Sequence, residues 1–375
     1  MKRIFRRILT PLCLALLCTS APVLADSPVY TDLTEACRDV RASVYEHQTH
    51  IEFSLTPDAV AGRPQYVIRD ILTDVLEGYI DYTILFSQQE QLLDITIDGT
   101  MRPALNILRA WKTGDRSALT QDESRCMDIA LDIAQECLRS AKSIPEIELA
   151  INNAICRRIA GYTGNPHPAF GTKEYMRTYS CIGALLDGET FCMGYAEVFY
   201  LIGRMAGLDV EMQYGFSDSS SNAKHAWNIV RIGSKVYALD SCWSDISGDI
   251  FELTAPDYRY FNTGLDLMPQ GRRAHPEAQI AAVSETTDLN HSSFGEGKGG
   301  ILAATLEEAI DYGIARHNAG EPYAHIFIPD QTISLSEVND AMKARVKSEN
   351  ITTVWGRMTH SFAGGTYVIF RWVLK

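Results

Sequence analysis

Basic residues are under-represented in this chain. Its 375 residues include 34 Lys and Arg against 47 Asp and Glu, so the formal net charge is −13 at pH 7. Proteins that bind nucleic acid or anionic lipid normally present a basic patch to the phosphate groups. We therefore expect no nucleic-acid partner and no electrostatic attachment to an anionic membrane.

Long apolar runs are also scarce. The one substantial apolar stretch follows the basic start of the chain, extends to Leu24 and is interrupted by Pro11. A basic start, a short apolar core and the small-residue site Val23-Leu24-Ala25 are typical of a cleaved signal peptide rather than a membrane span. We predict a signal peptide over residues 1–25. The protein is then secreted, in a periplasmic or extracellular location, with no stable membrane insertion after cleavage.

Paired cysteines of the Cys-x-x-Cys type are absent, and this argues against a structural zinc site. We expect no metal and no cofactor. Seven of the nine cysteines follow the predicted cleavage site. In an oxidising compartment an odd number fits one reactive thiol and six that could pair, and several could equally be buried thiols. A Cys181–Cys242 bridge is one of the pairings that the sequence leaves open.

Cys192 has the most informative setting of these cysteines. It precedes the run 193–206, which has no proline, is rich in helix formers and ends at Gly207, so we predict a helix there. Thr190 as N-cap would place Cys192 in the first turn. Helix N-termini stabilise a thiolate and offer free N–H groups to an oxyanion. The helix is apolar nearly all round, which predicts that it is buried.

His225 and Asp240 flank a predicted hairpin. Two β-prone runs, residues 226–232 and 235–239, are separated by the turn signal Gly233-Ser234. A turn centred there, which pairs position 225 with 242, or one residue earlier, which pairs 225 with 240, places the side chains of His225 and Asp240 on the same face of the sheet. The carboxylate can then orient one imidazole nitrogen and leave the other for the thiol. This is the arrangement that a thiol nucleophile needs.

Three ordered motifs support that interpretation. They are Gly183-Ala184-Leu185 with Gly188 and Cys192-Met193-Gly194-Tyr195-Ala196, then His225-Ala226-Trp227-Asn228, then Asp240 with Trp243 and Asp245. This pattern, over roughly residues 147–283, resembles the catalytic core of the transglutaminase-like superfamily in its bacterial secreted branch. The resemblance implies an α+β, papain-like cysteine-enzyme core in which the nucleophile helix packs on an antiparallel sheet. By the same resemblance, Cys192 is the nucleophile, His225 the base and Asp240 the orienting acid.

Other polar and aromatic residues near these motifs have simpler interpretations. His167 lies between two prolines in a long loop, where a loop role is expected rather than that of a rival base. Packing is expected for Tyr179, Tyr195, Trp227 and Trp243. Asn228 and Asp245 are expected to be structural.

The chain divides into several segments by composition and pattern. We predict an N-terminal α+β domain at 26–143, the core at 144–283, a linker at 284–300 and a small α/β domain at 301–375. The N-terminal domain is expected to have helices at 31–45, 66–78 and 122–143, and strands at 49–55, 92–97 and 104–111. The C-terminal domain is expected to have helices at 306–317 and 335–348, and strands at 324–329, 351–357 and 365–373.

Two functions fit these observations. The first is thiol-dependent acyl transfer on peptide or glutamine carboxamide groups through a Cys192 thioester, with transglutaminase, deamidase and peptidase outcomes all open. Its partner is a protein or peptide, such as a cell-wall peptide. The alternative is a non-catalytic cell-surface or cell-wall binding protein that uses the same fold as a scaffold.

Overall fold

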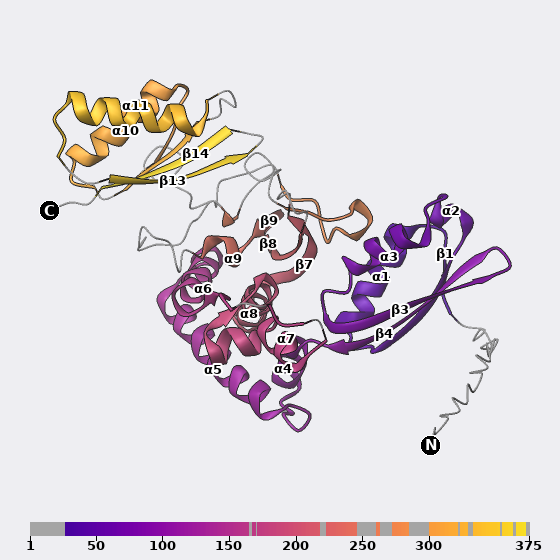
Figure 1. Cartoon of the computed structure of the whole chain (residues 1–375). Coiled ribbons are helices and arrows are strands. Elements are labelled where there is room, and N and C mark those ends of the chain that lie inside the picture. The colour runs from indigo at the N-terminus through magenta and orange to yellow at the C-terminus, as the bar shows by residue number, and fades with distance from the viewer. Residues whose placement is uncertain are drawn as a thin grey trace, which may run out of the picture.

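The computed structural model describes residues 27–164, 167–169, 171–217, 223–245, 260–262, 272–284, 300–321, 323–328, 333–352, 355–362 and 365–372. Within them the chain forms three four-stranded sheets, one two-stranded sheet and the helices that pack on them (Figure 1). The strand pairs are mostly antiparallel, which agrees with the predicted α+β class. None of the described helices has both the length and the apolar composition to cross a bilayer. The predicted signal peptide lies outside the described residues.

The N-terminal region, residues 27–140, begins with a sheet in the order β1-β2-β4-β3. Its strands are β1 (Val29–Tyr30), β2 (His50–Leu55), β3 (Tyr79–Gln89) and β4 (Leu92–Met101), and its first helices are α1 (Leu33–Tyr45), α2 (Pro57–Val60) and α3 (Gln65–Thr73). Sequence analysis located β2, β4, α1 and α3 but missed the short elements β1 and α2 and the long strand β3. Strand β3 does alternate, because Ile80, Tyr82, Ile84 and Phe86 are buried or half-buried and are separated by polar or exposed residues, so the signal was present in the sequence; only its end, residues 87–89, is polar and exposed throughout.

The prediction of a strand over residues 104–111 is wrong, because the chain forms helix α4 (Pro103–Thr113) there. Pro103 occupies the first turn, where a missing N–H loses no intrahelical hydrogen bond. The buried residues Leu105 and Leu108 recur at helical spacing. Gly114 then ends the helix with a φ of +73°, a left-handed conformation that glycine adopts without strain. These signals outweigh the β-propensity of the segment's Ile and Trp.

The central helices surround the one that begins at Cys192. They are α5 (Gln121–Ser140), α6 (Ile144–Arg158), α7 (Lys173–Thr178), the π-helical turn η1 (Gly183–Asp187) and α8 (Cys192–Met205). Helix α8 contacts α4, α5 and α6, and twelve of its fourteen residues are buried. The predicted burial of this helix is therefore confirmed.

A second four-stranded sheet packs against α8, in the order β10-β7-β8-β9. Its strands are β7 (Asp209–Ser217), β8 (Lys224–Ile232), β9 (Lys235–Leu239) and β10 (Arg272–Arg273), and they are followed or joined by helix α9 (Ser241–Ser244) and the 3-10 turn η3 (Pro276–Ala278). A short parallel pair, β5 (Ala160–Gly161) with β6 (Glu189–Thr190), lies just before α8. All strand pairs of the four-stranded sheet are antiparallel, so a buried helix packs on an antiparallel sheet, as predicted.

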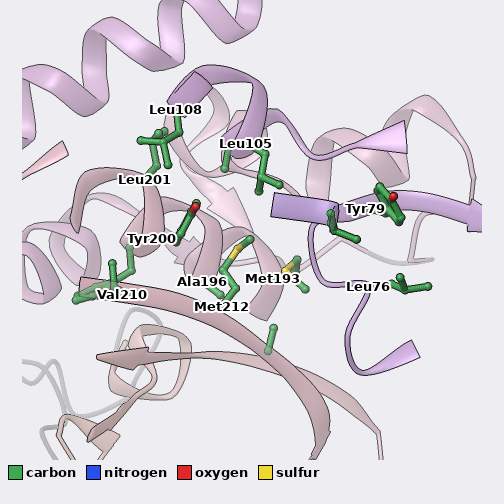
Figure 2. Close-up of a cluster of buried hydrophobic side chains, with 14 of the residues drawn as sticks. Leu76, Tyr79, Leu105, Leu108, Met193, Ala196, Tyr200, Leu201, Val210 and Met212 are labelled. Carbon is green, nitrogen blue, oxygen red and sulfur yellow. The ribbon is translucent and has the colours of Figure 1, made fainter. Parts of the chain in front are cut away.

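One hydrophobic core joins the N-terminal region to α8 and the second sheet. Figure 2 shows Leu105 and Leu108 of α4 with Tyr200 and Leu201 of α8 and Val210 of β7 in this core. The predicted boundary near residue 143 thus lies between elements that bury a common surface. The domain limits themselves stay a prediction.

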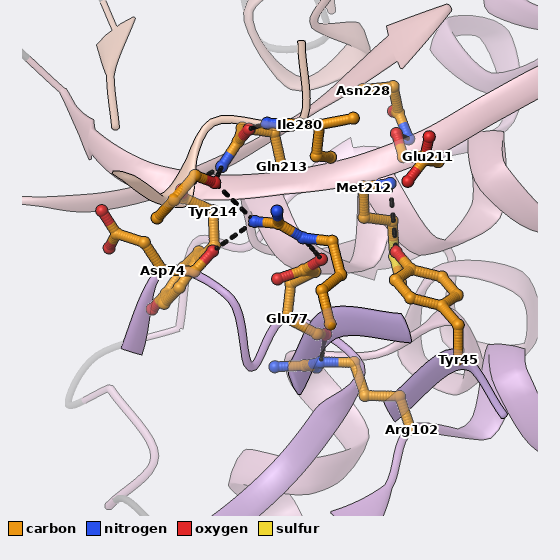
Figure 3. A network of polar contacts seen from close by, with 12 residues as sticks. Tyr45, Asp74, Glu77, Arg102, Glu211, Met212, Gln213, Tyr214, Asn228 and Ile280 are labelled. Carbon is orange, nitrogen blue, oxygen red and sulfur yellow. Dashed lines mark hydrogen bonds and ion pairs between the residues drawn. The ribbon is translucent and has the colours of Figure 1, made fainter. Parts of the chain in front are cut away.

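Buried ion pairs connect the same elements. The Arg41 guanidinium donates to Glu77 Oε1 over 2.7 Å and to the backbone oxygen of Ala278 over 2.6 Å. Arg102 donates through Nε to the backbone oxygen of Glu77 (Figure 3) and through Nη1 to Glu197 Oε1 in α8, over 2.7 and 2.9 Å. Because these charges are buried, each depends on its partner for compensation. The network fixes the N-terminal region against α8 and against the segment after β10.

The C-terminal unit, residues 300–372, has a sheet in the order β11-β12-β14-β13. Its elements are β11 (Gly300–Leu302), α10 (Leu306–Asn318), β12 (Tyr323–Ile328), α11 (Leu335–Ser348), β13 (Trp355–Phe362) and β14 (Gly365–Trp372). Both helices lie on one side of the sheet (Figure 1) and form a separate core with it. In the aromatic last strand, Phe370 and Trp372 are buried, so they serve packing. The predicted linker lies outside the described residues, apart from its first and last positions.

Candidate active site

Cys192 is the first residue of α8 and is partly exposed, whereas most of the helix behind it is buried. The prediction that it lies in the first turn is confirmed. The predicted cap is wrong, because Phe191 occupies the N-cap position and Thr190 donates its hydroxyl to the Thr178 backbone oxygen over 2.7 Å. The first N–H groups of a helix have no intrahelical acceptor. The Cys192 backbone N–H is therefore available to donate to an oxyanion that forms on a carbonyl group bonded to the Cys192 sulfur.

Gly194 explains why glycine follows Cys192 at this spacing. A Cβ at this position would lie 1.8 Å from the Thr190 hydroxyl oxygen and 2.9 Å from the Ser180 backbone oxygen. Both distances are too short for a contact between non-bonded atoms, so only glycine at this position lets α8 approach the segment that precedes it. The Gly194 backbone thus helps to fix where the helix begins and where the thiol projects.

The hairpin of β8 and β9 brings His225 to Asp240. Asn228 pairs with Leu239 and Ile232 with Lys235, so the turn is centred on residues 233–234, one of the two predicted registers. Asp240 Oδ2 lies 2.7 Å from His225 Nε2, and both side chains are buried. Contact through Nε2 leaves the other ring nitrogen for Cys192, and the Cys192 side chain does interact with the imidazole. The structure therefore brings the three predicted site residues together.

Charges around the imidazole favour its protonated form. Burial lowers the pKa of His225, but the Asp240 carboxylate and the Cys192 thiolate together raise it to about 9. Burial raises the pKa of Asp240, and attraction to His225 and to Arg272 overcomes this and lowers the pKa below its ordinary value. Near neutral pH the imidazolium form is thus favoured beside the Asp240 carboxylate, with Cys192 on its other side. This is a charge pattern that activates a thiol.

Trp243 is more closely involved than sequence analysis indicated. Its ring stacks on the His225 imidazole, with centroids 4.4 Å apart and planes 21° apart, and its backbone N–H donates to Asp240 Oδ1 over 3.1 Å. Trp227 is buried and its ring lies 6.2 Å from the imidazole. Both tryptophans are therefore packing residues, and Trp243 also restricts how the imidazole can turn.

The neighbouring polar residues have structural roles, as predicted. Asn228 donates to the Ala196 backbone oxygen in α8 over 3.0 Å, which ties the sheet to the helix. The Tyr195 hydroxyl donates to the Asp245 carboxylate, and this hydrogen bond connects α8 to the end of α9. His167 is exposed, and its ring packs on Phe191 at 4.9 Å. That contact agrees with the loop role expected for it.

Sequence analysis missed Arg272. This residue lies in β10, and its Nη1 is 2.8 Å from Asp240 Oδ2, the same oxygen that contacts His225. It belongs to none of the motifs and follows Asp240 after a long interval in the sequence. A helical or strand period does not extend over such an interval, so no local pattern could reveal the contact.

An aromatic row borders the thiol. The rings of Tyr175 and Tyr179 stack at 4.2 Å, and those of Tyr179 and Phe191 at 4.1 Å, all partly exposed. Burial raises the pKa of Tyr179 to about 12, with further contributions from Tyr175 and from the charge of Cys192. Tyr179 thus packs on its neighbours, as expected, and also lies near the nucleophile.

The seven described cysteines are all free. The Cys181–Cys242 bridge that the sequence left open is not formed, because the thiol beside Cys181 is that of Cys126. Burial, together with the charges of Asp240 and Cys192, raises the pKa of Cys242 well above its ordinary value.

Among the described residues, no group of three or more His, Cys, Asp or Glu side chains is placed to hold a metal ion.

No family model matches the chain, and no curated protein matches it. Solved structures that it resembles include a protein described as a TGase, at 10% identity, 62% of this chain, 64% of that chain and a TM-score of 0.27. Others are a proposed cysteine protease from Cytophaga hutchinsonii (11% identity, 44% and 65% coverage, TM-score 0.26) and a proposed protease from Parabacteroides distasonis (8%, 86% and 65%, 0.28).

The chain therefore spans slightly less than two thirds of each of these proteins. They are of the kind that the transglutaminase-like resemblance implies. What the site can do chemically follows from the motifs and from the geometry of Cys192, His225 and Asp240.

Proposed function

We propose that the chain is a secreted, thiol-dependent acyl-transfer enzyme that acts on peptide or glutamine carboxamide groups. One observation carries the proposal: the buried His225 imidazole contacts the Asp240 carboxylate over 2.7 Å and also interacts with Cys192. A structural histidine needs only one such partner. A thiol at a helix N-terminus, a histidine and an orienting carboxylate together form a nucleophile, an acid–base group and its support.

The proposed reaction follows from this arrangement. The Cys192 thiolate forms a bond to the carbonyl carbon, and the Cys192 N–H stabilises the oxyanion. His225 gives its proton to the nitrogen that leaves, the carbon–nitrogen bond breaks, and a thioester remains. Water or an amine then attacks the thioester while His225 takes up a proton, which restores the thiolate. Water gives deamidation or peptide cleavage, and an amine gives cross-linking.

Incubation with a glutamine-containing protein and a labelled primary amine tests the proposal. Mass spectrometry would show amine addition at Gln for a transglutaminase, a one-dalton gain for a deamidase and backbone cleavage for a peptidase. Cys192→Ala should abolish the product. Cys137→Ala, which removes a buried thiol from α5, is the matched control and should retain it. A product that survives Cys192→Ala would refute the proposal.

Thiol labelling tests the activated nucleophile without a known substrate. We expect Cys192 to react with iodoacetamide at pH 6–7 faster than the other thiols, and His225→Ala to slow it. Burial raises the pKa of Cys37 to about 12 and also raises the pKa of the Cys156 thiol, so both should label slowly. Uniform slow labelling of all seven would favour the non-catalytic scaffold.

A further inference from the structure

Arg272 is a buried cation in contact with the site. Its side chain is 3% exposed, and its guanidinium lies 2.8 Å from Asp240 Oδ2. The guanidinium carbon lies 5.6 Å from the Trp227 ring, 5.5 Å from the Trp243 ring and 5.9 Å from the Tyr260 ring. A guanidinium is planar and weakly hydrated, so it can be buried among aromatic faces.

Four neighbours hold Asp240 in place. Its Oδ2 contacts both Arg272 and His225, and its Oδ1 accepts from the Trp243 backbone N–H. Its own backbone N–H donates to the Tyr260 backbone oxygen over 2.8 Å. Trp243 also stacks on the imidazole that Asp240 orients. The carboxylate, the imidazole and the guanidinium therefore form one packed group rather than separate pairs.

We propose that Arg272 is a positioning residue of the active site, which fixes the Asp240 carboxylate so that Asp240 in turn fixes the His225 imidazolium toward Cys192. The inference rests on the proposed function, because it assumes that Cys192 is the nucleophile. It adds a fourth member to the group that the three motifs define.

The charges in the site support this role. A thiolate, an imidazolium, a carboxylate and a guanidinium sum to zero. Without Arg272 the same group, in which His225 and Asp240 are buried and Cys192 is partly exposed, would carry a net negative charge, which burial and mutual repulsion disfavour. The site would then relieve that charge by keeping a proton on the thiol. Arg272 thus favours the reactive form of Cys192 without touching the substrate.

The pH dependence of Cys192 alkylation tests the proposal. In Arg272→Met, we expect the rate–pH curve to shift upward by about one unit, which slows labelling at pH 6 about tenfold. Arg272→Lys should show a smaller shift, because it keeps the charge and loses the planar fork. In turnover of a glutamine substrate, kcat should fall while KM is unchanged. Arg273→Met removes the adjacent, exposed arginine and should leave the curve unchanged.

Chemical rescue separates positioning from a merely structural role. Guanidinium ion at millimolar concentration should restore labelling of Arg272→Ala, whereas the same concentration of sodium chloride should not. A folded Arg272→Met whose curve matches the wild type would overturn the inference. If Arg272→Met does not fold, a folded Arg272→Lys with an unshifted curve would overturn it. Failure of wild-type Cys192 to label selectively would instead refute the proposed function.

Discussion

The N-terminal region and the C-terminal unit have similar architectures, but only the first shares a hydrophobic core with α8. Each has a four-stranded sheet with helices. The N-terminal region shares its core with α8 and sends Arg102 to Glu197 inside that helix. The buried cluster among the described residues of the C-terminal unit is formed by residues 303–372 alone. The difference indicates that the N-terminal region belongs to the frame that holds Cys192, whereas the C-terminal unit packs independently of it.

The strongest test of that difference removes Glu197. Its side chain is fully buried, pairs with Arg102 over 2.9 Å and accepts from the Cys181 N–H over 3.0 Å. Glu197→Ala leaves Arg102 as an uncompensated buried charge, so we expect the free energy of unfolding to fall by about 3–5 kcal/mol. Cys192 labelling should slow with it. Urea unfolding followed by tryptophan fluorescence measures the loss.

Glu197→Gln is the matched control, because it keeps the side-chain shape and a hydrogen-bonding oxygen. It should lose less stability than the alanine variant. An alanine variant as stable as the wild type would show that the ion pair contributes nothing to the frame.

A pair of core truncations compares the two regions directly. Leu105 in α4 and Ile326 in β12 are both buried, so replacing either with alanine should cost about 2–5 kcal/mol in its own core. We expect Leu105→Ala to lower the unfolding transition of the central region and to slow Cys192 labelling. Ile326→Ala should lower only the transition of the C-terminal unit. Scanning calorimetry and labelling of the same samples measure both effects. Equal effects on labelling would contradict the comparison.

The same contrast explains what sequence alone could predict of the fold. Helix α8 and strands β8 and β9 carry strong local patterns, so their limits were predicted within a few residues. The sequence of α4 indicates a strand instead, because its branched and aromatic residues favour β-structure in isolation. Its helical period becomes decisive only when α5 and α8 bury one of its faces.

The site shows a corresponding limit. Cys192, His225 and Asp240 can be predicted because each lies at or next to the end of a regular element, and a hairpin register relates the last two. Arg272 and the stacking of Trp243 on His225 depend on how the chain returns after β9. The N-cap was misassigned because Thr190 uses its hydroxyl on Thr178 instead. Long-range contacts of this kind leave no periodic trace in a sequence.

A smaller effect concerns pH. The pKa of His225 is raised in the folded state to about 9, above its ordinary value near 6.5. A raised pKa stabilises the fold fully below the unfolded value and loses this contribution as pH rises toward 9. We therefore expect the central region to lose about 2–3 kcal/mol between pH 6.5 and 9. Urea titrations at both values measure it, with His225→Gln as the comparison.

That comparison is needed because Glu148 acts in the same direction. Burial raises its pKa to about 8, despite the hydrogen bond from Asn262, so part of the loss should persist in His225→Gln. The share that disappears in the variant belongs to the imidazole. An identical pH dependence in both proteins would show that His225 is not held as an imidazolium.

The smallest effect is expected at the surface of the C-terminal unit. Arg345 pairs there with Asp311, whose side chain is 53% exposed. Solvent screens such a pair, and the two long side chains lose entropy when they form it. We expect Asp311→Asn to leave both the C-terminal transition and Cys192 labelling unchanged, in contrast to the buried pair of Arg102 and Glu197. A clear fall in the melting temperature would show that surface charges help to stabilise this unit, and slower labelling would show that it communicates with the site.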